Sequence, residues 1–127
     1  MREIVSTDHG PKAIGPYSQG VKANGFVFIS GQVALNPATG QLVEGGIAQQ
    51  TERVLENLRG IVEASGSSMH KAVKVSVFLK DMNDFAKMNE TYSGYFPTNP
   101  PARTTVEVAR LPRDVGIEIE LIALDRK

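Results

Sequence analysis

The sequence predicts an α+β fold in which one sheet carries two helices on a single face. Segments with strand-like and helix-like periodicity follow one another along the 127 residues in the order β-β-α-β-α-β-β. Strands gathered in one layer and helices in another are typical of α+β architectures. No internal repeat, low-complexity tract or Pro/Ser-rich linker interrupts the chain, so we expect residues 1–127 to form a single domain.

Residues 26–33 give the first strand pattern. Their sequence, FVFISGQV, is apolar on both parities, as in a strand that is covered on both faces. The turn-forming residues NPATG follow at 36–40. The pattern therefore predicts a hairpin in which residues 41–43 pair back on the first strand.

Residues 47–65 have the periodicity of an amphipathic helix. Apolar or small side chains recur every three or four residues, and the pattern ends at Gly66, a common helix terminator. The predicted buried stripe consists of Ile47, Thr51, Val54, Leu55, Leu58, Ile61, Val62 and Ser65.

A second helix is predicted to begin at Asn83 or Asp84, either of which can cap its first turn. The segment from Asn99 to Pro101 stops it, because proline disfavours a helical residue before it. Its predicted buried stripe consists of Phe85, Met88, Tyr92 and either Tyr95 or Phe96.

Three further strands are predicted at residues 73–79, 103–109 and 117–124. In the first, Val73 begins an alternation that places apolar side chains on one face. The last two strands are joined by a loop that contains residues 111–116.

Alternation along these strands also predicts the side chains on the face away from the helices. If Val106 and Val108 face the helices, Arg103 and Thr105 face away. This face is too apolar for solvent and too charged for a dry core, so we expect it to be a subunit interface with a polar cleft. Its predicted members are Phe78, Arg103, Thr105, Glu118, Glu120, Ile122 and Leu124.

Charge and composition exclude several classes of function. Lys and Arg total 14 and so do Asp and Glu, so no strong field would attract nucleic acid or anionic lipid. Without cysteine the chain has neither disulfide nor thiolate chemistry. The N-terminal residues do not resemble a signal peptide, and no apolar run approaches the ~18 residues of a membrane span. We expect a cytoplasmic protein.

Three positions are candidates for binding or catalysis, each with a structural alternative. Arg103 begins a strand and could grip a carboxylate through its planar guanidinium, or form an ordinary salt bridge. Glu118 could orient or deprotonate a water, or pair with a surface cation. The Gly/Pro-rich segment 13–20 could place Tyr17 over a small ligand, or form a structural turn.

Other chemistries find little support in the sequence. The two histidines, His9 and His70, lack metal-ligand spacing, so no metal site is predicted. Ser30 has no histidine partner in a recognisable context, and the glycines form no phosphate-binding fingerprint.

From about residue 11 to residue 125 the chain resembles the Rid (YjgF) family. Seven motifs at matching spacing carry the resemblance: IGPYSQG at 14–20, ISGQ at 29–32, NPATG at 36–40, VFLKDMNDF at 77–85, NETY at 89–92, PAR at 101–103 and IEIE at 117–120.

The resemblance implies a chorismate-mutase-like fold, a homotrimer whose sheets form a central barrel, and ligand clefts between neighbouring subunits. It implies hydrolysis of reactive 2-imino or enamine acids, such as 2-iminobutanoate and 2-iminopropanoate, to 2-oxo acids and ammonia, with no cofactor. Arg103 would grip the substrate carboxylate and Glu118 would hold the attacking water. Further pocket residues would be Tyr17, Ser30, Gly31, Asn89 and Thr105.

Two positions depart from the family pattern. Thr105 stands where many members carry cysteine, and Thr104 stands where they carry a smaller residue, so the substrate range is open. Two alternative functions also remain: a module that binds or senses a small carboxylate without turnover, and RNA cleavage, which zero net charge and the lack of paired histidines disfavour.

Overall fold

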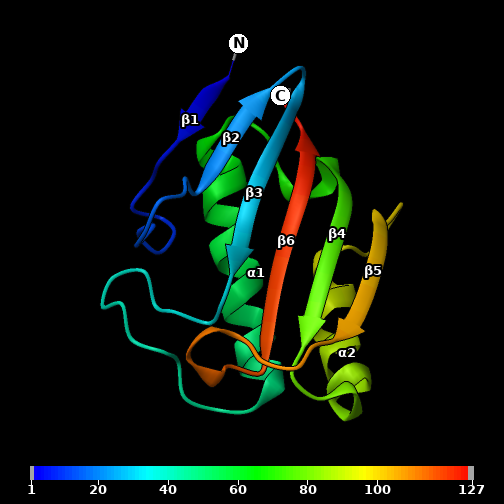
Figure 1. Ribbon diagram of the computed structural model, residues 1–127. Coiled ribbons are helices and arrows are strands. Elements are labelled where there is room, and N and C mark those ends of the chain that lie inside the picture. Colours follow the sequence, from blue (N-terminus) through cyan, green and yellow to red (C-terminus); the bar gives the residue numbers. More distant parts are fainter. Residues whose placement is uncertain (1, 126–127) are drawn as a thin grey trace.

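The computed structural model describes residues 2–125 as a mixed six-stranded sheet with both helices on one face (Figure 1). The sheet order is β1-β2-β3-β6-β4-β5, and only β4 and β5 pair in parallel. The strands are β1 (Glu3–Val5), β2 (Gly20–Ala23), β3 (Phe26–Gln32), β4 (Ala72–Leu79), β5 (Ala102–Glu107) and β6 (Ile117–Leu124). The predicted α+β class, with two helices on one face, is confirmed.

The N-terminal part of the sheet differs from the prediction. β3 pairs with the preceding β2 through a two-residue turn at Asn24 and Gly25, whose φ angles are 52° and 86°. Positive φ at both positions matches the twist of antiparallel strands. The chain turns back at residues 36–40 as predicted, but residues 41–43 form no strand and do not pair with β3. They form an isolated bridge between Leu35 and Leu42, with backbone hydrogen bonds from Asn36 to the Gln41 carbonyl and from Val43 to the Ala34 carbonyl.

The helix α1 (Ile47–Ala64) confirms the first predicted helix. Every residue of the predicted stripe is buried, and Gly66 follows the helix with a φ of 94°. The stripe packs against β3 and β6 in the core. Asn57 is a buried polar exception, and its Nδ2 donates to the carbonyl oxygens of Val33 (3.2 Å) and Leu35 (2.9 Å).

The helix α2 (Phe85–Tyr95) follows a 3-10 turn, Met82–Asp84, so the predicted start is close to the observed one. Met88 and Tyr92 are buried as predicted, and so is Phe96 just beyond the helix. Phe85 is 37% exposed and does not belong to the core.

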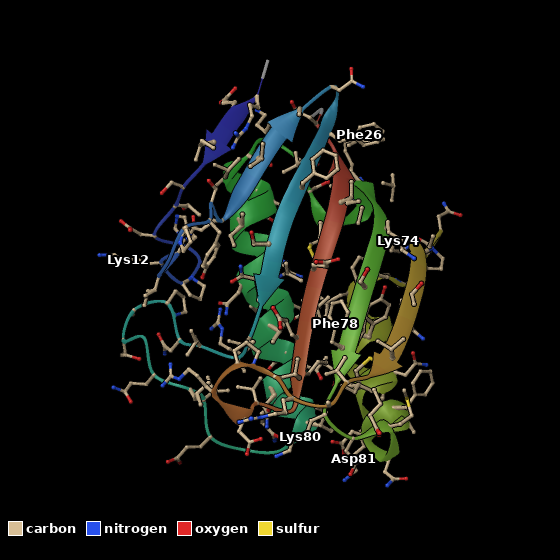
Figure 2. The ribbon with its side chains drawn as sticks, viewed as in Figure 1. Lys12, Phe26, Lys74, Phe78, Lys80 and Asp81 are labelled. Carbon is tan, nitrogen blue, oxygen red and sulfur yellow. The ribbon has the colours of Figure 1, made fainter. Side chains whose placement is uncertain are left out.

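The central strands have one face under the helices and one open face. On β4 and β6 the buried side chains are Ala72, Val75, Val77, Leu79, Ile117, Ile119, Leu121 and Ala123. Phe78 and Glu118 are cross-strand partners on the open face, which faces the viewer in Figure 2. Val73 is exposed because the β4–β6 register shifts between Ala72 and Lys74. The open-face assignment of Phe78 and Glu118 is therefore confirmed, and that of Val73 to the buried face is wrong.

The predicted orientation of β5 is wrong. Arg103 pairs with Val75 and Thr105 with Val77, so both lie on the helix side, whereas Val106 pairs with Phe78 on the open side. β5 is an edge strand with no buried residue, so hydrophobicity does not decide which of its faces turns toward the helices.

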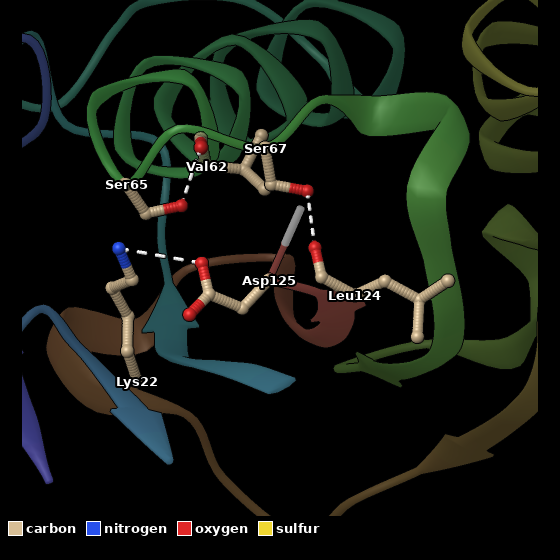
Figure 3. Close-up of polar contacts among 6 residues, drawn as sticks. All are labelled: Lys22, Val62, Ser65, Ser67, Leu124 and Asp125. Atoms are coloured by element: carbon tan, nitrogen blue, oxygen red, sulfur yellow. Dashed lines mark hydrogen bonds and ion pairs between the residues drawn. The ribbon is translucent and has the colours of Figure 1, made fainter. Parts of the chain in front are cut away.

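Two polar contacts hold the end of β6 (Figure 3). Ser67 Oγ donates to the Leu124 carbonyl at 2.6 Å, and Lys22 Nζ lies 3.3 Å from Asp125 Oδ1. Ser65 Oγ donates to the Val62 carbonyl at 2.6 Å. The Ser67 and Lys22 contacts attach the C-terminal strand to the segment after α1 and to β2, whereas the Ser65 bond lies within the end of α1.

Within residues 2–125, neither helix has the length and apolar character needed to cross a membrane.

Replacing Asn57 by alanine should destabilise the chain, because the carbonyls of Val33 and Leu35 would lose their buried donor. We expect a loss of about 2–4 kcal/mol in the free energy of unfolding, measured by urea denaturation at a fixed protomer concentration. Glu52→Ala on the exposed side of α1 is the control and should change stability little. Equal stability of the two variants would contradict this role of Asn57.

Candidate functional site

The predicted site residues separate into two groups on opposite faces of the sheet. Arg103 lies opposite Val75 on the helix side, and Glu118 lies opposite Phe78 on the open side. Tyr17, Ser30, Gly31 and Glu118 line one cleft. Asn89 belongs to α2 and contacts Arg103 of β5, and Thr105 lies on the same side of β5 as Arg103. A single chain therefore does not bring Arg103 and Glu118 together.

The first group lines a cleft of about 600 Å³ on the open face, called here the open-face cleft. Its polar groups come from a loop, from the end of β3 and from β6, while apolar side chains form another part of its wall. The residues that line it are Lys12, Ile14, Tyr17, Ser30, Gly31, Val33, Leu35, Pro112, Arg113, Glu118 and Glu120.

A β-bulge shapes the floor of this cleft. The β3–β6 register shifts between Ile29 and Gln32, so Ser30 and Gly31 depart from regular pairing with β6. A β-carbon on Gly31 would overlap Oε2 of Glu118 and lie only 2.9 Å from its carboxyl carbon. Glycine at position 31 thus provides the space in which the Glu118 carboxylate lies.

Burial raises the pKa of Glu118, and the nearby charge of Glu120 raises it further. Both effects disfavour the charged carboxylate relative to one in water. A carboxyl group with a raised pKa can accept and return a proton nearer neutral pH than an ordinary glutamate.

Buried Gln19 fixes the loop that carries Tyr17. Its side-chain Nε2 donates to the carbonyls of Thr7 (3.0 Å) and Pro11 (2.7 Å), and its Oε1 accepts from the backbone amide of Thr7 at 2.7 Å. Ser30 Oγ donates to the Ser18 carbonyl at 2.6 Å. These bonds join the loop to β3, while Tyr17 itself stays 52% exposed at the cleft.

In the second group, Arg103 contacts three side chains of α2, and these four residues are called here the Arg103 cluster: Phe85, Asn89, Tyr92 and Arg103. Arg103 Nη1 donates to Asn89 Oδ1 at 2.7 Å. The guanidinium carbon lies 4.7 Å from the ring centre of Tyr92 and 5.5 Å from that of Phe85. The contact with Asn89 uses one N–H, and the guanidinium has five.

Thr105 lies next to this cluster, on the same side of β5 as Arg103. Its Oγ1 is buried and has no hydrogen-bond partner among residues 2–125. The sequence interpretation did not identify Phe85 and Tyr92 as partners of Arg103, nor the buried hub Gln19. The glycine inside the strand at position 31 was an available signal for the bulge.

Within the described chain, residues 2–125, no group of three or more His, Cys, Asp or Glu side chains is arranged to hold a metal ion.

Gly31→Ala should displace the Glu118 carboxylate, because the new methyl group would occupy its position. Moving the carboxylate toward water should lower its raised pKa, which a pH titration of the ¹³C carboxyl signal would measure. Gly94→Ala on α2 is the control, since a β-carbon there meets no atom within 4 Å. An unchanged Glu118 titration in Gly31→Ala would mean that the backbone absorbs the methyl group instead.

Comparisons with known proteins extend over nearly the whole chain. The family model described as Endoribonuclease L-PSP matches residues 7–125. A RutC family protein of Pyrococcus horikoshii is 57% identical over 97% of this chain and 98% of its own length. The 2-iminobutanoate/2-iminopropanoate deaminase of Mus musculus is 47% identical over 98% of this chain and 92% of its own.

A solved structure agrees with these sequence matches. The crystal structure of E. coli TdcF with bound serine has a TM-score of 0.92 and 44% identity, and the alignment covers 96% of this chain and 98% of TdcF. Family model, relatives and fold agree with the motifs found in the sequence, and the chain belongs to the Endoribonuclease L-PSP family, also called Rid or YjgF.

Proposed function

We propose that this protein hydrolyses reactive 2-imino and enamine acids, such as 2-iminobutanoate and 2-iminopropanoate, to 2-oxo acids and ammonia. We further propose that it acts as a cytoplasmic homotrimer with active sites between subunits. The observation that carries the proposal is the pair of chemically complementary groups, Arg103 and Glu118, on opposite faces of one sheet. The deaminase name of a 47% identical relative supports the reaction.

The Arg103 cluster suits the carboxylate of the substrate. A guanidinium fits a carboxylate through two parallel hydrogen bonds, and this geometry fixes the orientation of the bound molecule. Because Asn89 already accepts from Nη1, the guanidinium is held while other N–H groups remain for a ligand.

The open-face cleft suits the reacting carbon and the attacking water. Glu118 would orient the water and take its proton, as its raised pKa favours. The water oxygen bonds to C2 of the protonated imine as Glu118 takes a proton from the water, which gives a carbinolamine. That proton passes to the amine nitrogen, the C–N bond breaks to release ammonia, and the hydroxyl loses its proton to Glu118 to form the 2-oxo acid. An imine carbon is already electrophilic, so positioning and one base suffice in this scheme.

The apolar wall of the cleft fits the side chains of the proposed substrates. Val33 and Leu35 lie on the same cleft as Glu118, and Ile14 extends beside them with 86% of its surface exposed. Methyl and ethyl groups, as in 2-iminopropanoate and 2-iminobutanoate, would bury apolar surface there.

Two subunits are needed to complete this site. β4 lies between β5 and β6, and the pleat directs Arg103 and Glu118 to opposite sides. The open face also exposes apolar surface, including 43% of Phe28, that an association would cover. In the proposed trimer, the β5 edge of one subunit approaches the open-face cleft of the next.

Two inactive variants should therefore restore activity when they share one trimer. Arg103→Ala should lose at least about tenfold in affinity, and Glu118→Gln about 10²-fold in turnover. Co-expressed at equal levels, they should regain about a quarter of wild-type activity, since mixed trimers contain one site with both residues intact. Loss of imine generated by threonine dehydratase measures the rate, and light scattering measures the mass.

Several controls make this test decisive. Arg103→Lys keeps the charge and loses the planar fork, so it should stay impaired if geometry matters. A wild-type protein that binds 2-oxobutanoate without imine turnover would support a carboxylate-binding module instead. Ribonuclease activity that survives Arg103→Ala would belong to a contaminant or to another site. Full mass without recovery in the mixed trimers would refute the shared active site.

The pH dependence should report the coupling between Glu118 and Glu120. Glu118 must be deprotonated to act as a base, so kcat/KM should fall as pH falls through its raised pKa. Glu120→Gln removes a charge that raises this pKa, so the acid limb should move to lower pH. Glu118 would be excluded as the titrating group if the acid limb of kcat/KM stayed in place in Glu120→Gln and also persisted in the Glu118 variants.

A further inference from the structure

The helix α2 presents three side chains to Arg103. Phe85, Asn89 and Tyr92 are spaced i, i+4 and i+7, so they lie on one face of the helix. Asn89 accepts from Nη1, and the two aromatic rings lie within 5.5 Å of the guanidinium carbon. One helix face therefore makes the contacts that define where the guanidinium lies.

Tyr92 makes the closest ring contact and is the most deeply buried of the three. It is 5% exposed, and its ring centre lies 4.7 Å from the guanidinium carbon of Arg103. The ring centres of Tyr92 and Phe96 are also 4.7 Å apart. A guanidinium over an aromatic face is attracted by the ring quadrupole, most strongly where water is excluded. The Tyr92 ring thus provides a fixed surface under a side chain that has four rotatable bonds.

The hydroxyl of Tyr92 is buried and makes no hydrogen bond of regular geometry among residues 2–125. Burial raises its pKa, while the charge of Arg103 and a polar interaction of the guanidinium with the hydroxyl oppose the change. The contact between the guanidinium and the Tyr92 ring does not need the hydroxyl, so Tyr92→Phe separates the contribution of the ring from that of the hydroxyl.

We propose that Tyr92 is a positioning residue whose ring holds the Arg103 guanidinium in the plane required to grip a carboxylate. The inference rests on the proposed function for its effect on substrate. Its effect on Arg103 itself does not, because β5 is an edge strand without buried residues and α2 supplies the neighbours of the side chain. Without the ring, the guanidinium would sample several rotamers and pay an entropic cost on each binding event.

The test compares Tyr92→Phe with Tyr92→Leu and Tyr92→Met in the full chain. The phenylalanine variant keeps the ring and should retain the wild-type KM. The leucine and methionine variants should raise KM about three- to thirtyfold with kcat nearly unchanged, since the lost interaction positions a binding group. Phe96→Leu, which alters the same aromatic pair away from Arg103, should lower stability without raising KM.

An NMR signal provides a readout that needs no substrate. The Nε–Hε resonance of Arg103, assigned by its loss in Arg103→Lys, should be sharp in the wild type and in Tyr92→Phe, and broadened or lost in Tyr92→Leu and Tyr92→Met. If the wild type hydrolyses no imine, the proposed function fails while this signal still decides the role of Tyr92. A sharp signal in both non-aromatic variants, or loss in Tyr92→Phe, would overturn the proposal.

Discussion

The register of β4 against its two neighbours is the constraint on which the rest of the structure depends. Val75 lies opposite Leu121 of β6 and Arg103 of β5. The face to which Val75 points therefore determines the face to which the paired side chains of both flanking strands point. Val75 is fully buried under the helices, which fixes this orientation. A slip of one residue would exchange the faces of every side chain on the strand. The separation of Arg103 from Glu118 is thus a consequence of core packing.

The Glu118 carboxylate and the Arg103 guanidinium are held in place by different contacts. Glu118 lies where Gly31 leaves room for it, at a bulge that interrupts regular pairing between β3 and β6. Arg103 is held from outside the sheet, by an amide and two rings of α2. Burying a carboxylate and ordering an arginine both reduce stability, and such arrangements are characteristic of sites whose chemistry requires them.

The sequence predicted the fold where one pattern dominated and failed where two patterns competed. The periodicity of α1 had no rival, and its buried stripe is confirmed residue by residue. The turn signal at residues 36–40 drew the prediction, but it closes only an isolated bridge, whereas the shorter signal at Asn24 and Gly25 joins two strands of the sheet. Short strands such as β1 and β2, with few apolar residues, leave little periodicity to detect. The orientation of Arg103 was wrong because hydrophobic alternation carries no information on an exposed edge strand.

The same limit explains why the motifs pointed to Arg103 while Tyr92 was assigned no role beyond the core. An aromatic residue at helical spacing is typical of a buried stripe, and Tyr92 does belong to one, beside Met88 and Phe96. Its contact with Arg103 arises only when β5 pairs in parallel with β4 and places the arginine over α2. Since that pairing joins segments separated by a whole helix, no local pattern encodes it. The geometry of the carboxylate-binding group therefore depends on how α2 packs against the sheet, and core substitutions beneath this helix act on Arg103 without touching it.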